Sequence, residues 1–212
     1  MDNIESLQYE ETQQAGLRER KKRQAQAAIE EAALRLFQQK GYEQTSIQDI
    51  ADAVTMSPRT FFRYFASKEE ILSGLIRTIQ RDGIRSLYHV ESTASPHNAL
   101  RELFGCLASR YQQQRSGLLI RYQIAMQTPS IASLFLYALL ETEPAICDAL
   151  CSRLEPAADR NEMRFLVAIY MASLRVAIGE WLEYEDKLDL VSRLYKHLDY
   201  FLTIPLGNKQ MK

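Results

Sequence analysis

One short segment, residues 57–65, holds the side chains best suited to chemistry. Ser57 followed by Pro58 pairs an N-cap residue with a proline at the first helical position, which predicts a helix from Ser57 to Phe65. On a helical wheel Phe61 and Phe65 share one side, and the other side and its flanks carry Arg59, Thr60, Phe62, Arg63 and Tyr64. Arginine can donate two hydrogen bonds to guanine, threonine can contact a thymine methyl group, and tyrosine can donate to a phosphate. This face therefore predicts nucleic-acid binding in a major groove, with a merely solvated surface as the alternative.

Other helices must position this segment. An apolar stripe at helical spacing runs from Ile29 to Phe37, and Gly41 ends it. Thr45 with Gln48 three residues on reads as a capping box, and Ser67 with Glu70 as a second one that opens a helix to about Val90. Two short helices joined by a three-residue turn have the dimensions of a helix-turn-helix.

The runs GYEQTSIQDIA (41–51) and SPRTFFRYFASKEE (57–70) resemble the signature of the TetR family of bacterial repressors, in its AcrR-like form. The match covers about fifty residues and uses many positions at fixed spacing. Two positions depart from it. Thr55 lies in the middle of the turn where the family usually has glycine, so a left-handed conformation there would strain a β-branched residue. Phe62 replaces the commoner tyrosine and removes one hydroxyl.

The resemblance implies an all-α homodimer with an N-terminal three-helix DNA-binding head and a larger body that binds a ligand and dimerises. It implies a double-stranded DNA operator as partner. The implied DNA contacts are Thr45, Gln48, Arg59, Thr60, Phe62, Arg63, Tyr64 and Lys68. We expect a tail over residues 1–16 without fixed structure, a head over 17–68, a body over 69–206 and a second tail over 207–212.

Charge is distributed unevenly in a chain whose net charge is −1. Residues 17–68 carry ten Lys/Arg against six Asp/Glu, which suits a module that neutralises phosphates. Five of these bases precede the first apolar stripe, in the run LRERKKR (17–23), and the candidate DNA contacts among them are Arg18, Arg20, Lys21 and Lys22. They read either as an arm that reaches an adjacent minor groove or as a solvated helix start. Because basic charge at a helix N-terminus opposes the macrodipole, the arm is the favoured interpretation.

The rest of the chain reads as helices over roughly 97–114, 117–127, 130–153, 160–184 and 187–204. The last two are apolar enough to form a four-helix bundle across a dimer axis, as the resemblance implies, or to form ordinary core. Large aromatics and two arginines predict a small-molecule site, although each residue would also suit a helical core. The candidate ligand-binding residues are Arg121, Tyr122, Met126, Tyr170, Arg175 and Trp181. The body loosely resembles regulators similar to the one in the mycofactocin system, some of which sense acyl-CoA.

Nothing in the body predicts catalysis or a cofactor. His89, His97 and His197 lie far apart without partners at metal-ligand spacing, so neither an enzyme nor a metal site is expected. Cys147 and Cys151 read as small core residues rather than a redox pair. The acidic N-terminus is no secretory signal, no long apolar run predicts a membrane span, and a cytoplasmic protein is expected. The sequence therefore predicts a repressor that a small apolar or amphipathic effector releases from a palindromic operator, with an architectural or cell-division DNA-binding protein as the alternative.

Overall fold

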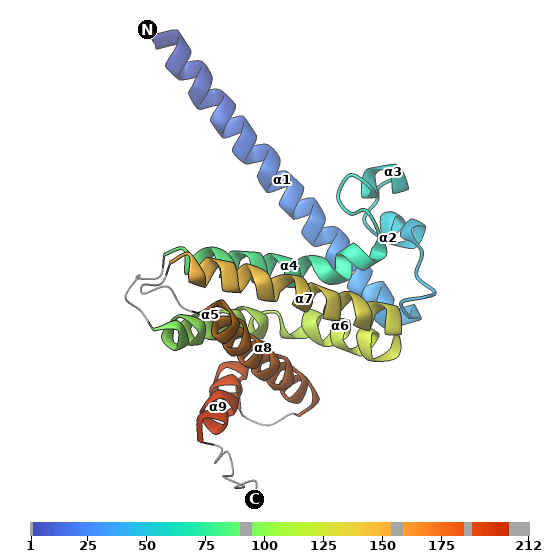
Figure 1. The fold of residues 1–212 in the computed structure, drawn as a ribbon. Helices are drawn as coiled ribbons and strands as arrows, with labels where there is room; N and C mark the ends of the chain where they lie inside the picture. Colours follow the sequence, from blue (N-terminus) through green and yellow to red (C-terminus); the bar gives the residue numbers. More distant parts are fainter. Residues whose placement is uncertain (1, 90–94, 154–158, 185–187, 204–212) are drawn as a thin grey trace, which may run out of the picture. The chain divides into compact units, whose positions relative to one another are not determined.

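The computed structural model describes residues 2–89, 95–153, 159–184 and 188–203, and within these ranges the chain forms nine α-helices and no strand (Figure 1). The expected all-α fold class is confirmed. The chain divides into two compact units, Met1–Gly74 and Leu75–Lys212. The helices are α1 (Asp2–Lys40), α2 (Ile47–Ala53), α3 (Pro58–Phe61), α4 (Lys68–Leu87), α5 (Pro96–Gln112), α6 (Arg115–Gln127), α7 (Pro129–Cys151), α8 (Arg160–Glu183) and α9 (Leu190–Thr203).

The first unit buries the apolar stripe of α1 against α2 and α3. Ile29, Ala33 and Phe37 are almost fully buried, as are Ile50 of α2 and Phe61 of α3. Gly41 ends α1 with a φ of +88°, the left-handed conformation that glycine adopts without strain. The predicted stop of the first helix is therefore confirmed.

The structure differs from expectation at three places in this unit. Helix α1 begins at Asp2, so residues 2–16, expected to lack fixed structure, are helical; the segment has no proline, and its Glu, Gln and Leu residues favour helix. The capping box of α2 uses Ser46 and Asp49 instead of Thr45 and Gln48. Helix α3 ends at Phe61 rather than Phe65, and residues 62–64 continue as turns.

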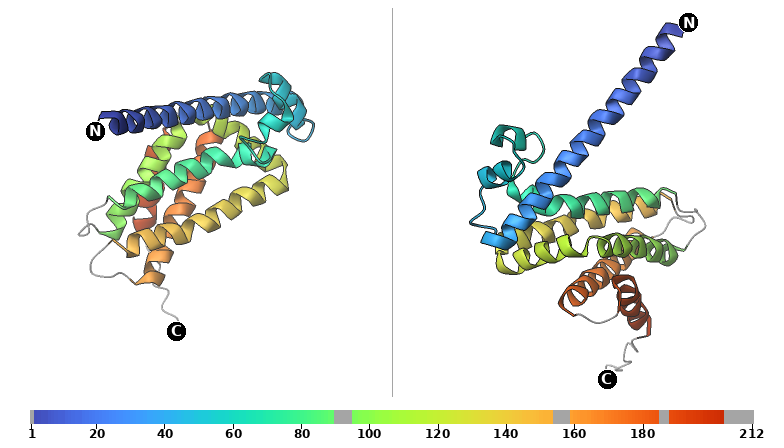
Figure 2. Two further views of the ribbon diagram at one scale, coloured as in Figure 1. Left: turned by 90° about the horizontal axis from the view of Figure 1, so that it is seen from above. Right: turned by 180° about the vertical axis from the view of Figure 1, so that it is seen from behind.

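The second unit is built from α5 to α9 and the greater part of α4. Helix α8 packs on α5, α7 and α9, and Figure 2 shows these helices from two further directions. The core joins Leu100, Phe104, Val167 and Leu194 with residues of the other helices. The helices lie within a few residues of the predicted ranges, although Gly117 falls inside α6 instead of before it.

Two helices of this unit, α7 and α8, are long and apolar enough to cross a membrane by length and composition, contrary to the expectation from the sequence. Both also supply the core, since Ile146 and Val167 are almost fully buried. Core helices of soluble proteins pass the same test, so the observation is weak evidence for a membrane span.

Candidate nucleic-acid interface and ligand pocket

Helix α3 presents a mixed polar and aromatic face because its apolar anchors point inward. Ser57 caps the helix, its Oγ accepting from the Thr60 backbone N–H at 3.2 Å. Phe61 and Phe65 are buried, which fixes the side of the segment that faces the core. Arg59 and Arg63 are exposed, and Phe62 keeps 53% of its surface exposed. Two guanidinium groups and a ring thus lie open to solvent on one short segment.

Two other predicted DNA contacts, Thr60 and Tyr64, are less exposed than Arg59 and Arg63 and make contacts within the first unit. The hydroxyl groups of Thr60 and Ser57 lie 2.9 Å apart, so the Thr60 side chain also supports the cap. Tyr64 is half-buried, and its backbone carbonyl accepts from Gln26 of α1 at 3.4 Å. This contact holds the end of the α3 segment against α1.

The turn before α3 carries strain at Thr55, which has a φ of +55°. The left-handed conformation that the sequence analysis considered for Thr55 is therefore present in the structure. Its N–H donates to the Asp52 carbonyl at 3.1 Å, and Met56 N donates to Ala51 O at 2.9 Å, as in a helix C-terminus that turns sharply. This conformation is unfavourable for a β-branched residue, so the surrounding contacts must hold the turn in it.

Thr45 is placed wrongly by the sequence argument. It is fully buried, and its hydroxyl donates to the Gly41 carbonyl at 2.7 Å, so its side chain cannot reach DNA. The neighbouring Ser46 is exposed and caps α2. Gln48 is exposed as expected, and its amide donates to Asp52 at 2.7 Å.

Lys68 is mainly an internal residue, contrary to its expected role at a phosphate. Its ammonium donates to the carbonyls of Tyr42 at 3.0 Å and Thr45 at 2.9 Å. It also lies 4.5 Å from the centre of the Tyr42 ring. An ammonium has three donors, so a single N–H remains for a phosphate.

The sequence argument gave no role to the Tyr42 hydroxyl or to Glu69, which complete this cluster. The Tyr42 hydroxyl donates to Glu69 Oε1 at 2.6 Å. Burial and the nearby Glu69 carboxylate raise the pKa of Tyr42 well above its usual range. Together with Lys68, these contacts fasten the start of α4 to the loop before α2.

A second set of contacts holds α2 to the end of α1. Lys40 Nζ lies 2.8 Å from Asp49 Oδ1, and the Ser46 N–H donates to Asp49 Oδ2 at 2.7 Å. Lys40 and Ser46 hold the pKa of the Asp49 carboxyl well below its usual range. The capping box is thus anchored by charge as well as by hydrogen bonds.

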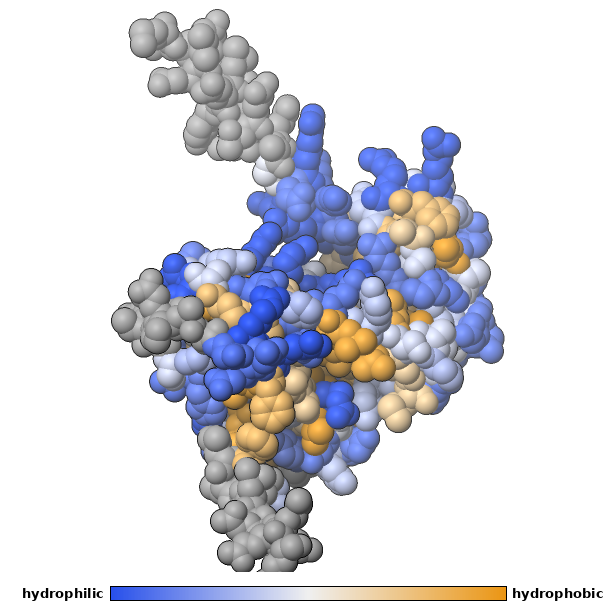
Figure 3. Space-filling view, in the orientation of Figure 1, coloured by the Kyte–Doolittle hydropathy of each residue, from blue (hydrophilic) through white to orange (hydrophobic). Residues whose placement is uncertain are grey.

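The basic segment before the apolar stripe is helical, since it lies inside α1. Arg18, Arg20, Lys21 and Lys22 are all exposed, and the visible surface of α1 that follows its grey start is hydrophilic in Figure 3. Arg23 pairs with Glu19 at 3.2 Å along the helix. The four basic residues therefore lie on an exposed helical face, and their contact with a minor groove stays a prediction.

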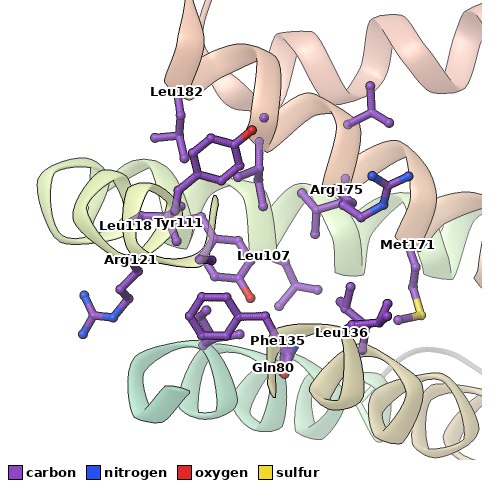
Figure 4. A pocket seen from close by; sticks show the side chains of 18 of the residues that line it. Gln80, Leu107, Tyr111, Leu118, Arg121, Phe135, Leu136, Met171, Arg175 and Leu182 are labelled. Carbon is purple, nitrogen blue, oxygen red and sulfur yellow. The ribbon is translucent and has the colours of Figure 1, made fainter. Parts of the chain in front are cut away.

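The second unit encloses a cavity of about 610 Å³ between α4, α5, α6, α7 and α8 (Figure 4). This volume lies within the usual range for small-molecule sites. Its wall is mostly apolar, with Phe104, Leu107, Phe135 and Ile146 among the lining residues. Figure 3 shows apolar residues on the visible face over α6 and α7. Met126 of α6 and Leu136 of α7 line the cavity and are also exposed.

Four of the six predicted ligand-binding residues line this cavity: Arg121, Tyr122, Met126 and Arg175. The other two do not. The Tyr170 hydroxyl is bonded to His97, with its oxygen 2.9 Å from Nδ1, and burial raises the pKa of Tyr170 to about 12. Trp181 is packed under Arg115, whose guanidinium carbon lies 5.1 Å from the ring centre. Both residues belong to the core.

The arginines of the cavity differ in position, on opposite sides in Figure 4. Arg121 is almost fully buried, and its Nη1 donates to the Gly117 carbonyl at 2.9 Å. Arg175 is exposed, and no described residue pairs with its guanidinium. The Tyr122 hydroxyl donates to Glu183 at 2.7 Å, and this bond and burial raise the Tyr122 pKa. Arg175 is thus the group best placed to meet an anion at the edge of the cavity.

Residues 29–75 match a family model described as bacterial regulatory proteins, tetR family. The chain is similar to the HTH-type transcriptional regulator TcmR of Streptomyces glaucescens, with 32% identity over 173 residues, 78% of this chain and 76% of that protein. It is also similar to RutR of Escherichia coli K12, with 27% identity over 150 residues, 71% of this chain and 63% of that protein.

Solved structures agree with these relatives. Thermus thermophilus FadR, a TetR family repressor in complex with lauroyl-CoA, aligns with a TM-score of 0.52 and 26% identity over 88% of this chain and 98% of that chain. FadR of Bacillus halodurans shares the fold, with a TM-score of 0.59 at 18% identity over 86% of this chain and 96% of that chain. The resemblance of the body to the mycofactocin-system subgroup is not confirmed.

Proposed function

Because the chain belongs to the TetR family of bacterial regulatory proteins, we propose that it is a transcriptional repressor that binds a palindromic operator as a homodimer. Regulation of transcription follows from the family; repression, the palindrome and the effector are the proposal. One observation carries it: Arg59, Phe62 and Arg63 are exposed on the segment whose Phe61 and Phe65 are buried. The head is assigned to residues 17–68 and the body to residues 69–206.

A second copy of the chain is supported by apolar side chains that remain exposed on α8 and α9. Phe165 is 68% exposed and Val176 39% exposed on α8, and Tyr200 and Phe201 are 67% and 43% exposed on α9. These helices carry the apolar surface that the sequence assigns to a four-helix bundle between subunits. Two heads related by a two-fold axis read half-sites about 34–36 Å apart, which requires a palindrome.

The cavity of the body supports a small apolar or amphipathic effector. Its aliphatic and aromatic wall accepts the apolar part, and Arg175 at its edge accepts an anionic group. Acyl-CoA is one molecule of this class, since the similar FadR of T. thermophilus was solved with lauroyl-CoA. Arg121, Tyr122 and Met126 complete the proposed effector contacts.

The relatives do not favour an architectural or cell-division protein, because TcmR and RutR are both named as transcriptional regulators. They do not favour an enzyme either. We place the protein in the cytoplasm, where its operator lies.

Footprinting with the purified protein across a bacterial genome tests the proposal. We expect a few palindromic sites upstream of genes, and loss of these footprints in an Arg59→Ala, Arg63→Ala double variant. Many scattered sites without a common palindrome would instead indicate the architectural alternative. Footprints unchanged in the double variant would refute the assignment of this face.

A further inference from the structure

We propose that Gln80 and Tyr111 form a recognition pair for an uncharged oxygen-bearing group, a hydroxyl or a ketone, on an otherwise apolar effector. The inference rests on the proposed function, because it takes the cavity of the body as the effector site. It names a chemical class of ligand and two residues that bind it.

Both side chains are buried but have no hydrogen-bond partner among the described residues. Gln80 is 8% exposed and Tyr111 is 4% exposed, and both line the cavity, where Figure 4 labels them. Among the described residues the polar atoms of Gln80 and Tyr111 are not sealed in the core but open onto the cavity, where its occupant can bond them. A ligand that supplies the missing hydrogen bonds is such an occupant.

The other polar groups of the wall already have partners. The Thr142 hydroxyl donates to the Ala138 carbonyl at 2.7 Å, and Arg121 and Tyr122 are bonded to Gly117 and Glu183. Glu180 accepts from Arg193 at 3.1 Å. Gln80 and Tyr111 inside the cavity are thus buried polar residues of the wall that have no described hydrogen bond, and Arg175 has none at its exposed edge.

The chemistry of the pair favours an uncharged ligand group. A glutamine amide offers two donors and an acceptor, and a tyrosine hydroxyl offers one donor and an acceptor. Burial raises the pKa of Tyr111 well above its usual range, so its hydroxyl stays neutral. Neither Gln80 nor Tyr111 carries a charge that could offset the lost hydration of a carboxylate bonded to them, whereas a hydroxyl or ketone is satisfied by them. An anionic group would instead be met by Arg175 at the edge of the cavity.

The pair joins two helices, one of which has residues in both units of the chain. Gln80 belongs to α4, which begins at Lys68 in the first unit and continues to Leu87 in the second, and Tyr111 belongs to α5. A ligand bonded to both residues would link α4 to the body. The hydrogen bond from Gln80 that recognises the ligand oxygen would then also be the contact through which the ligand displaces α4.

The test compares 2-naphthol, naphthalene and 2-naphthoate as probes on the full-length protein by calorimetry. We expect 2-naphthol to bind more tightly than the other two, and Tyr111→Phe or Gln80→Leu to weaken it about three- to tenfold without weakening naphthalene. Tyr137→Phe is the matched control, because Tyr137 is exposed and does not line the cavity. Equal affinities of the three probes, no binding of 2-naphthol at about 1 mM, the weak limit of measurable affinity, or 2-naphthol affinity unchanged in both variants would overturn the pair.

A measurement without ligand gives a second readout. Since the two groups have no partner among the described residues, Tyr111→Phe and Gln80→Leu should leave the Tm of the free protein unchanged or raised. A lowered Tm in both would show that the protein itself satisfies these groups and would also overturn the pair. Operator binding by the unliganded variants should equal that of the wild type. Failure of the pair therefore leaves the proposed repressor function standing, whereas failure of the wild type to bind any operator would refute that function.

Discussion

At the scale of single residues, Arg63 and Arg59 owe their position to the phenylalanines beside them. Because Phe61 and Phe65 are buried, the two guanidinium groups remain exposed. If Arg63 reads a guanine, Arg63→Ala should weaken operator binding by about 1–3 kcal/mol and relax the preference at one base pair of each half-site. A binding titration against operator variants measures both effects.

Arg77→Ala is the control for this prediction, because Arg77 is an exposed arginine on α4 outside the face of α3. This substitution should change affinity little. Equal effects of the two substitutions, or an unchanged base preference in Arg63→Ala, would show that Arg63 contributes only general charge.

Thr55 offers a prediction about stability. Its φ of +55° suits glycine, so Thr55→Gly should stabilise the protein by about 1 kcal/mol despite the larger backbone entropy of glycine in the unfolded chain. Thr55→Ala keeps a Cβ but removes the branch, so its free energy of unfolding should lie between those of the wild type and Thr55→Gly. Denaturant unfolding measures the stability of the wild type and of both variants. A loss of stability in Thr55→Gly would mean that the Thr55 side chain makes a compensating interaction.

Residue roles were the part of the site that sequence reasoning predicted least well. Thr45 and Ser46 are adjacent hydroxyl residues, and the packing of the preceding loop decides which one caps α2 and which one turns inward to Gly41. Lys68 was expected at a phosphate because its type suits one. Its use by the carbonyls of Tyr42 and Thr45 depends on contacts between residues far apart in the sequence, which no local pattern reveals.

At the scale of elements, the cap of α2 should respond to acid. The pKa of Asp49 is lowered in the folded protein, so its contribution to stability is fully present above about pH 4 and is lost as the pH falls below that. Asp49→Asn should therefore destabilise the protein at neutral pH and reduce the loss of stability on acidification. Thermal unfolding as a function of pH measures this. Asp52→Asn is the control, and an identical pH profile for both variants would contradict the role of the cap.

The basic face of α1 should contribute salt-dependent affinity. Replacing Arg18, Arg20, Lys21 and Lys22 by glutamine keeps good helix formers and removes the charge. For every phosphate that is no longer neutralised, the slope of log K against log salt should flatten by about 0.9. Glutamine at Arg77, Arg81 and Arg85 of α4 controls for general charge. A slope that stays intact in the α1 variant would show that these residues are a solvated helix surface.

Helices were predicted well because apolar periodicity, caps and prolines act locally. The breaks at Thr128–Pro129 and after Leu87 are close to their predicted positions. Gly117 failed as a break because a single glycine lowers helix stability by only about 1 kcal/mol, which packing of α6 against α5 and α7 offsets. The length of α1 was missed because polarity was read as disorder, although its residues favour helix.

At the scale of the whole molecule, the composition of the cavity wall could be predicted only in part, since four of the six predicted ligand-binding residues line it. A helical wheel shows that Tyr170 and Trp181 are inward-facing, but which neighbours they meet depends on how five helices assemble. They meet His97 and Arg115 instead of the cavity. Gln80 and Tyr111 line the cavity although they lie far apart in the sequence on different helices. A large aromatic with a polar tip, such as Tyr111, is a residue type that suits a ligand site, whereas no sequence pattern singles out Gln80.

The proposed release of the operator by an effector requires a link between head and body, and α4 has residues in both units. An effector that binds more tightly to a dimer whose heads no longer match the half-sites must lower operator affinity, and the operator must lower effector affinity by the same factor. We expect this factor to be about 5- to 150-fold, which corresponds to a coupling of 1–3 kcal/mol. Mass spectrometry of co-purified ligand identifies the effector for the test.

Anisotropy of a labelled operator, with and without effector, gives the factor by which the effector lowers operator affinity. Calorimetry of the effector, with and without operator, gives the factor by which the operator lowers effector affinity. Trp181 does not line the cavity, but Glu180 and Leu182 on either side of it do, so its emission should change indirectly on binding. Arg175→Ala should weaken an effector with an anionic group and leave the operator affinity of the free protein intact, because Arg175 lies in the body. Because linkage makes the two factors equal at equilibrium, unequal values would show that one of the two titrations did not measure an equilibrium affinity. An effector that binds without changing operator affinity would exclude release by ligand as the mechanism.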